Sequence, residues 1–315
     1  MRAILLLLIW IGGASDVFAI DFARYHAQDE INAYMRDLAT AYPGLVRFRA
    51  LGYSEQGREI NYVVISKGDP EALPALYLNG THHGNEKSST ESVLGLIDYL
   101  VTHRSDPHVA PLLDSYAIYL QPLVNPDGHA ANTRGDARGR DPNRDYSYPE
   151  RSDDDSFKTP PVRLVKDLTD KVKFHAAVAY HSGMEAVLWP LCYTPQHAAE
   201  YDTFYTLSKL TADAMGIGQY MQSFSDYPSH GEFIDYAYLA HGTIALTLEV
   251  SAQGNPPAPQ LAAVVRRAIA GGMTFMLGVM QMDEGSLEMR HAPDVRPVAA
   301  PAMTLFSKPL ITAAE

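Results

Sequence analysis

ALYLNGTHHGNEKSSTESVLGLIDYL, residues 75–100, is the stretch that decides the fold class of this chain. Residues 75–79 form a short apolar run, which predicts a buried strand. Residues 88–101 predict a helix, because apolar side chains recur there at helical spacing: Val93, Leu96, Ile97 and Leu100. A strand that runs directly into a helix is the building unit of α/β proteins.

His83 and Glu86 lie at the corner between this strand and this helix. The carboxyl ends of strands in an open α/β sheet are where ligands bind, and nitrogen and oxygen donors suit zinc. An H-x-x-E pair alone is a weak signal. It is equally explained by a turn histidine followed by a glutamate that the helix dipole favours.

A second predicted strand, residues 174–180, ends in His181. This histidine supplies the third ligand that a catalytic zinc needs while one position stays open for water. Taken alone, it is also explained as a structural histidine at a strand end.

Glu249 lies near the end of another apolar strand, residues 243–250. Burial raises the pKa of a carboxyl group towards the working pH, as a general base acting on a metal-activated water requires. The alternative is a buried carboxylate paired with an arginine.

A basic segment, residues 132–146, carries Arg134, Arg138, Arg140 and Arg144. The Arg144 fork beside the Asn143 amide would make a good carboxylate clamp. By composition alone the segment is also explained as a solvated, charged loop.

Strands and helices alternate along the rest of the chain, so we predict one α/β domain around a central sheet. Further strands are expected at residues 46–53, 61–67 and 116–123. Further helices are expected at residues 28–42, 199–215 and 259–278. Residues 125–128, Asn-Pro-Asp-Gly, predict a turn.

The two ends differ from this domain. Arg2 followed by an apolar run over residues 3–13 predicts a signal peptide over residues 1–19. That run is too short to cross a bilayer, so we expect export to the periplasm or medium and no stable membrane anchor. Residues 283–315 predict a Pro/Ala-rich tail, which leaves residues 20–282 as the globular domain.

The amino-acid composition limits the kinds of partner that the protein can bind. The formal net charge of −12, from 37 acidic and 25 basic residues, argues against nucleic acid as a partner. Cys192, the single cysteine, lies in an apolar stretch, which favours buried packing over a role as nucleophile.

The order of these motifs resembles the zinc metallocarboxypeptidase family, the carboxypeptidase A-like peptidases. The resemblance covers residues 25–278 and rests on motifs in the family's order: Ser54-x-x-Gly57-Arg58, His83-x-x-Glu86, Asn125-Pro126-Asp127-Gly128, Asp141-Pro142-Asn143-Arg144, His181-Ser182 and Glu249. It implies a central mixed, mainly parallel eight-stranded twisted sheet flanked by helices. It also implies that residues 20–282 are a catalytic domain. Between Ile20 and the start of the matching segment there is no room for a large activation domain, so we expect none there.

The resemblance further implies roles for the site residues. His83, rather than its neighbour His82, would bind one Zn²⁺ together with Glu86 and His181. Glu249 would be the general base and acid. Arg134, in preference to Arg138 or Arg140, would stabilise the oxyanion. Asn143 and Arg144 would bind the free C-terminal carboxylate of a peptide substrate.

Two more positions follow from the resemblance. Tyr227 falls where the family has a mobile tyrosine that closes over the substrate. Ile234 falls where the family lines its specificity pocket, which implies an apolar or aromatic C-terminal residue. Glu232 and Asp235 nearby keep a basic residue open. Asn85 and Gly183 stand where the digestive members carry an arginine and a tyrosine, so the resemblance does not extend to those substrate contacts.

We therefore predict a zinc-dependent exopeptidase that hydrolyses C-terminal peptide bonds. The alternatives are a peptidoglycan-trimming carboxypeptidase, a zinc amidohydrolase or deacylase of related fold, and a non-catalytic binding homologue. An intact Glu249 argues against the last of these.

Overall fold

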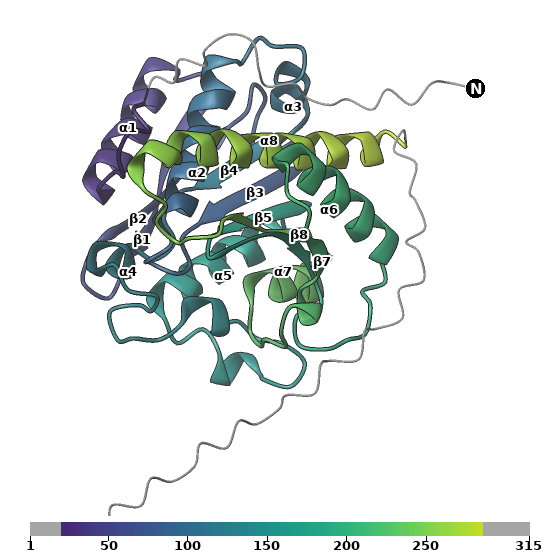
Figure 1. The fold of residues 1–315 in the computed structure, drawn as a ribbon. Helices are drawn as coiled ribbons and strands as arrows, with labels where there is room; N and C mark the ends of the chain where they lie inside the picture. Colours follow the sequence, from purple (N-terminus) through teal and green to yellow (C-terminus); the bar gives the residue numbers. More distant parts are fainter. Residues whose placement is uncertain (1–19, 286–315) are drawn as a thin grey trace, which may run out of the picture.

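The computed structural model describes residues 20–285, and in Figure 1 helices cover both faces of a twisted central sheet. The predicted signal peptide, and the tail beyond Gly285, lie outside the described residues. The strands are β1 Val46–Tyr53, β2 Glu59–Ile65, β3 Ala75–Gly80, β4 Ala117–Gln121, β5 Ala176–His181, β6 Met184–Trp189, β7 Tyr220–Gln222 and β8 Ile244–Ser251.

The sheet has eight strands in the order β1-β2-β4-β3-β5-β8-β6-β7. The pairs β3–β4, β3–β5, β5–β8 and β6–β7 are parallel, whereas β1–β2, β2–β4 and β6–β8 are antiparallel. The predicted mixed, mainly parallel eight-stranded sheet is therefore confirmed.

The helices are α1 Gln28–Ala41, α2 Lys87–Thr102, α3 Ala110–Ser115, α4 Pro126–Ala131, α5 Pro160–Val172, α6 Tyr201–Met215, α7 Phe233–His241 and α8 Ala258–Asp283. Three short 3₁₀ helices also occur: η1 Pro142–Arg144, η2 Asp153–Asp155 and η3 Ser223–Ser225. The predicted turn at Asn125 is instead the start of α4, where the Asn125 side chain accepts a hydrogen bond from the Gly128 N–H at 3.0 Å.

Alternate residues of the central strands face two separate cores. On β3, Leu76 and Leu78 pack into the cluster that holds residues of α1, α2, α3, α6 and α8. Ala75 and Tyr77 pack into the other cluster, with residues of α5 and α7. Central strands buried on both faces read as nearly continuous apolar runs, which is why the strands were visible in the sequence.

Helix α8 is long and apolar enough to cross a membrane, with 26 residues and a mean hydropathy of 1.3 in its most apolar window. However, 72% of that window is buried within the structure, against α2, α6 and the sheet. The helix is therefore explained as a core element, and its apolar character needs no lipid. It is the one helix of residues 20–285 that meets these criteria.

Candidate active site

The corner after β3, which carries His83 and Glu86, is held from two sides. Thr81 adopts a left-handed conformation with φ of 63°, which is unfavourable for a branched residue and persists only where contacts enforce it. Its hydroxyl lies 2.8 Å from the Ser89 hydroxyl on α2, and its carbonyl accepts the Asn125 N–H at 3.0 Å. The chain therefore leaves the sheet in a fixed direction.

Gly84 lets this corner touch the start of α4. A Cβ atom at Gly84 would lie 2.0 Å from the carbonyl carbon of Gly128, a separation that no side chain tolerates. The glycine between the two predicted ligands is thus required by close backbone packing. That packing fixes the backbone positions from which the side chains of His83 and Glu86 extend.

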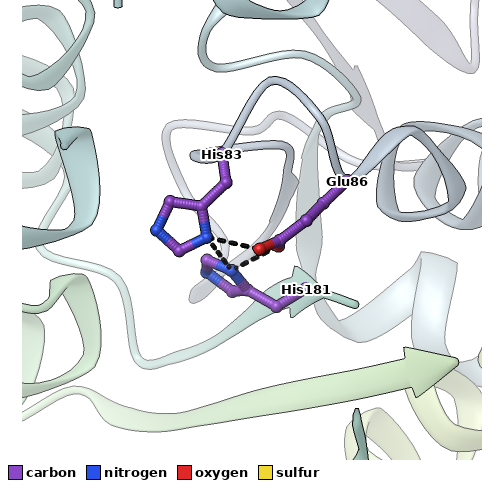
Figure 2. A group of neighbouring side chains, drawn as sticks. All are labelled: His83, Glu86 and His181. Atoms are coloured by element: carbon purple, nitrogen blue, oxygen red, sulfur yellow. Dashed lines mark hydrogen bonds and ion pairs between the residues drawn. The ribbon is translucent and has the colours of Figure 1, made fainter. Parts of the chain in front are cut away.

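His83, Glu86 and His181 turn their polar atoms towards one another (Figure 2). His83 Nδ1 lies 2.6 Å from Glu86 Oε1, and His181 Nδ1 lies 2.9 Å from Glu86 Oε2. The two Nδ1 atoms are 3.2 Å apart, and all three residues are buried. Two imidazole nitrogens that face each other beside a buried carboxylate make a site that favours a cation.

These donors fit a zinc ion. Bonds of about 2.1 Å in a tetrahedral site put neighbouring ligand atoms about 3.4 Å apart, so a small outward movement of the side chains makes room. His83 Nε2 lies 3.1 Å from Asp141 Oδ1. A carboxylate on that nitrogen holds the ring with Nδ1 free to bind a metal. Asp141 was part of a motif in the sequence but had no role assigned to it.

Glu249 lies beside the cluster because β5 and β8 pair in parallel, with His181 opposite Glu249. Its Oε2 atom is buried and has no hydrogen-bond partner within residues 20–285. Burial, and then the negative charge of Glu86, raise the pKa of Glu249 well above 4.5. A raised pKa makes this carboxylate a stronger base than an ordinary glutamate, as general base catalysis requires.

One cavity of about 150 Å³ gathers every predicted site residue except Ile234. These are His83, Glu86, Arg134, Asn143, Arg144, His181, Tyr227 and Glu249. A larger hollow of about 480 Å³ lies between α1 and the β1–β2 turn, and none of the predicted site residues lines it. The smaller cavity is therefore the one that can do chemistry.

The predicted carboxylate clamp forms one wall of the cavity. Arg144 Nη2 donates to the Tyr227 hydroxyl at 2.6 Å, and Nη1 lies 3.1 Å from Glu232 Oε1. Asn143 Oδ1 accepts the Phe233 N–H at 3.0 Å, which ties the clamp to the start of α7. Tyr227 is 51% exposed, so its ring lies at the rim of the cavity.

Three arginines were candidates for stabilising the oxyanion: Arg134, Arg138 and Arg140. Of these three, only Arg134 lines the cavity. Its Nε donates to Asp141 Oδ2 at 2.8 Å, and its Nη1 lies 3.7 Å from Glu86 Oε1. Arg138 instead pairs with Glu55, and Arg140 donates to the backbone carbonyl of Lys158. The neighbouring His82 lies 2.9 Å from the Tyr146 hydroxyl through Nε2 and is not part of the metal cluster.

Ile234 lies elsewhere than its predicted role requires. It is 1% exposed and packs in the core cluster with residues of α5 and α7, and it is absent from the cavity wall. The wall instead includes Glu232, Asp226 and Thr247, of which only Glu232 was considered from the sequence. Thr247 could have been found, since residues two apart on a strand such as Thr247 and Glu249 share a face.

Comparisons with known proteins give the family of the chain and its fold. The zinc carboxypeptidase family model matches residues 31–271. Mouse carboxypeptidase M is 25% identical over 279 residues, covering 77% of this chain and 63% of its own. Zinc carboxypeptidase A 1 of Anopheles gambiae is 26% identical over 270 residues, covering 75% of this chain and 62% of its own. This chain therefore spans less than two thirds of either relative.

A solved structure gives the same fold. The carboxypeptidase A from Helicoverpa armigera superposes with a TM-score of 0.74 at 18% identity, covering 84% of this chain and 76% of that one. At that identity the likeness concerns the fold.

Proposed function

The chain belongs to the zinc carboxypeptidase family, and on that premise we propose that it is a zinc-dependent exopeptidase that removes the C-terminal residue of peptides. The single observation that carries the proposal is the cavity in which a zinc-fitting cluster, a buried carboxyl group and a carboxylate clamp meet. Each of the three parts alone has another explanation. Their convergence is what an exopeptidase needs.

His83, Glu86 and His181 would hold the zinc ion, with Asp141 orienting His83. Zinc, when bound, supplies a Lewis acid that polarises a carbonyl group and makes water easier to deprotonate. The other steps belong to side chains of the chain itself.

Glu249 accepts the proton of the attacking water and returns it to the leaving amine. Its raised pKa suits both halves of this task, because a group that is a strong acid could not take the proton at neutral pH. Arg134 places a cation beside the cluster, where negative charge develops on the carbonyl oxygen of the substrate.

Arg144 and Asn143 bind the terminal carboxylate and so restrict cleavage to the last peptide bond. Tyr227 closes over the substrate from its exposed position and exchanges its hydrogen bond with Arg144 for one to the substrate. In this arrangement the clamp gives the exopeptidase its specificity, whereas the metal cluster and Glu249 give it its chemistry.

The test compares two N-blocked dipeptides that differ only in a free or amidated C-terminus. We expect hydrolysis of the free acid alone, loss of activity with a chelator, and recovery with zinc. Equal cleavage of the amide would contradict the clamp and favour an amidohydrolase.

Residues 1–19 lie outside the described residues, and we propose that they direct export. N-terminal sequencing of the mature protein should then begin near Ile20.

A further inference from the structure

His82, the residue directly before the metal ligand His83, is a polar side chain that is 0% exposed. Its Nε2 atom lies 2.9 Å from the Tyr146 hydroxyl, and its backbone carbonyl accepts a hydrogen bond from the Asn125 side-chain amide at 3.1 Å. Its Nδ1 atom is buried and has no hydrogen-bond partner in the part of the chain that the structure describes. A buried imidazole that pairs only one of its nitrogens is less favourable than an apolar side chain of the same size. The hydrogen bond to Tyr146 is therefore not explained by packing alone.

Tyr146 belongs to the same segment as the carboxylate clamp and lies two residues after Arg144. Its N–H donates to the Gly231 carbonyl at 3.1 Å, and a Cβ atom at Gly231 would lie 2.7 Å from the Arg144 carbonyl oxygen. The Tyr146 ring packs edge-on against Phe233, with ring centroids 5.7 Å apart. Phe233 in turn donates its N–H to Asn143 Oδ1 at 3.0 Å. Tyr146 and the clamp are therefore parts of one closely packed unit.

On its other side, His82 lies against the metal cluster. Its ring is nearly parallel to that of His181, with centroids 5.6 Å apart and an angle of 14° between the ring planes. His83, the next residue in the chain, places its ring edge-on to His181, with centroids 4.8 Å apart. A shift of His82 would therefore disturb both histidines of the cluster.

Asp141 makes a second link between the clamp segment and the cluster. Its Oδ1 atom lies 3.1 Å from His83 Nε2 and accepts the Asn143 N–H at 2.9 Å. One link alone would let the clamp turn about it, whereas two links fix its direction as well as its distance. The Asp141 side chain is 26% exposed, but His82 and Tyr146 are both 0% exposed. Water therefore competes with the first link and is kept away from the second.

We propose that the hydrogen bond between His82 and Tyr146 holds the carboxylate clamp in register with the metal cluster, so that both are positioning residues for cleavage of the last peptide bond. The inference rests on the proposed function, in which one substrate spans both parts of the site. Arg144 binds its terminal carboxylate, while the cluster and Glu249 act on the adjoining carbonyl group. A displacement of about 1 Å between the groups that bind and the groups that react can cost about a hundredfold in rate. Neither His82 nor Tyr146 lines the cavity, so each acts through the residues that do.

Two variants separate positioning from stability. Tyr146→Phe leaves His82 Nε2 without its partner, so both Tm and kcat should fall. His82→Leu combined with Tyr146→Phe removes both polar groups and leaves apolar side chains of similar size, so Tm should recover towards that of the wild type. We expect kcat of this double variant for a free-acid dipeptide to stay about tenfold or more below that of the wild type. KM should change by less than about threefold, because the clamp residues are intact.

Recovery of kcat together with Tm in the double variant would show that the hydrogen bond is merely structural and would overturn the inference. Tyr116→Phe is the matched control. It removes the hydroxyl of another buried tyrosine, which is bonded to Asp283 outside the cavity. This control should lower Tm and leave kcat unchanged.

A binding measurement tests the register without any hydrolysis. Calorimetry on the zinc-loaded protein compares 3-phenylpropanoate with benzylsuccinate, which is the same molecule with a second carboxylate. A probe that reaches the clamp and the metal at once gains affinity only if the two are correctly spaced. We expect benzylsuccinate to bind the wild type about a hundredfold more tightly than 3-phenylpropanoate, and this advantage to fall about tenfold in the double variant. An equal advantage in the two proteins, or none in the wild type, would overturn the inference.

The two measurements distinguish failure of this inference from failure of the proposed function. If the wild type hydrolyses no dipeptide but the double variant loses the benzylsuccinate advantage, the positioning role stands and the exopeptidase proposal fails. If dipeptides are hydrolysed and the double variant keeps both kcat and the advantage, only the positioning role fails.

Discussion

At the scale of single residues, the pKa values of two carboxyl groups in the same cavity, Glu86 and Glu249, are shifted in opposite directions. Burial alone would raise the pKa of Glu86, but the neighbouring His83 and His181 outweigh it and lower that pKa below 4.5. Burial and the charge of Glu86 raise the pKa of Glu249 instead. Pairs of titratable groups pushed apart in this way identify which one binds a cation and which one moves a proton.

Glu249→Gln keeps the shape of the side chain and removes its ability to take a proton. We expect kcat to fall by about a thousandfold or more, because general base catalysis is worth about two to four orders of magnitude. Zinc content, measured by atomic emission, should remain that of the wild type. Glu59→Gln, at a part-exposed position paired with Arg36, is the control and should keep full activity. A Glu249→Gln protein with normal turnover would rule out the mechanism.

Arg144→Lys tests the clamp while preserving the positive charge beside Glu232. A lysine cannot make the paired, planar contacts of a guanidinium with a carboxylate. We expect KM for the free-acid dipeptide to rise about tenfold and kcat to change much less, since the lost contact is made in the ground state as well. Arg138→Lys, outside the cavity, serves as the matched control. A fall in kcat alone, at constant KM, would argue that Arg144 acts elsewhere.

At the scale of elements, the long periodic segments were predictable and the irregular ones were not. The helices around Val93 and Val265 and the central strands were visible because their apolar faces are nearly continuous. Helix α7 was missed because its first residues, Phe233 to Ala237, are all buried, which erases the polar face that marks a surface helix. Strand β7, of 3 residues, is too short to show a period.

Helix α5 is a different case. Val162, Val165 and Leu168 recur at helical spacing after Pro160, so the signal was present in the sequence. The position of Ile234 was predicted from the order of a motif alone. A motif gives the order of residues along a helix but does not give the direction in which each side chain points.

Gly84→Ala tests whether the β3–α2 corner needs its close contact with α4. The added Cβ would overlap the Gly128 backbone, so the corner must move and carry His83 and Glu86 with it. We expect zinc affinity to fall by about tenfold or more, as for loss of a positioning contact at a metal site. Gly44→Ala, where an added Cβ meets nothing within 4 Å, is the control. Unchanged affinity, measured by competition with a chelating dye, would show that the corner tolerates the shift.

At the scale of the whole molecule, the site is a product of strand order. Glu86 follows β3, His181 ends β5 and Glu249 lies on β8, and these three strands are consecutive neighbours in the sheet (Figure 1). The sequence predicted that strand ends would carry the ligands. It could not predict that β5 and β8 would align His181 with Glu249, because register depends on packing between distant segments.

The arrangement links zinc binding to stability of the whole domain. Glu86 and His181 come from segments far apart in the chain, so an ion held between them binds the folded state and has no equivalent site in the unfolded chain. At a free zinc concentration one hundred times the dissociation constant, the folded state gains about 2.7 kcal/mol. For a domain of this size that gain raises Tm by about 5–10 °C.

Removal of the metal should therefore lower Tm by this amount, and added zinc should restore it, as measured by calorimetry with and without a chelator. His181→Asn should start from a lower Tm and lose most of the response, because one of the three ligands is gone. His108→Asn changes an exposed histidine that does not line the cavity. The Tm of this variant should respond to zinc like that of the wild type. If His181→Asn responded as fully as His108→Asn, the ion that stabilises the fold would lie at some other site, and the cluster between β3 and β5 would lose its assignment.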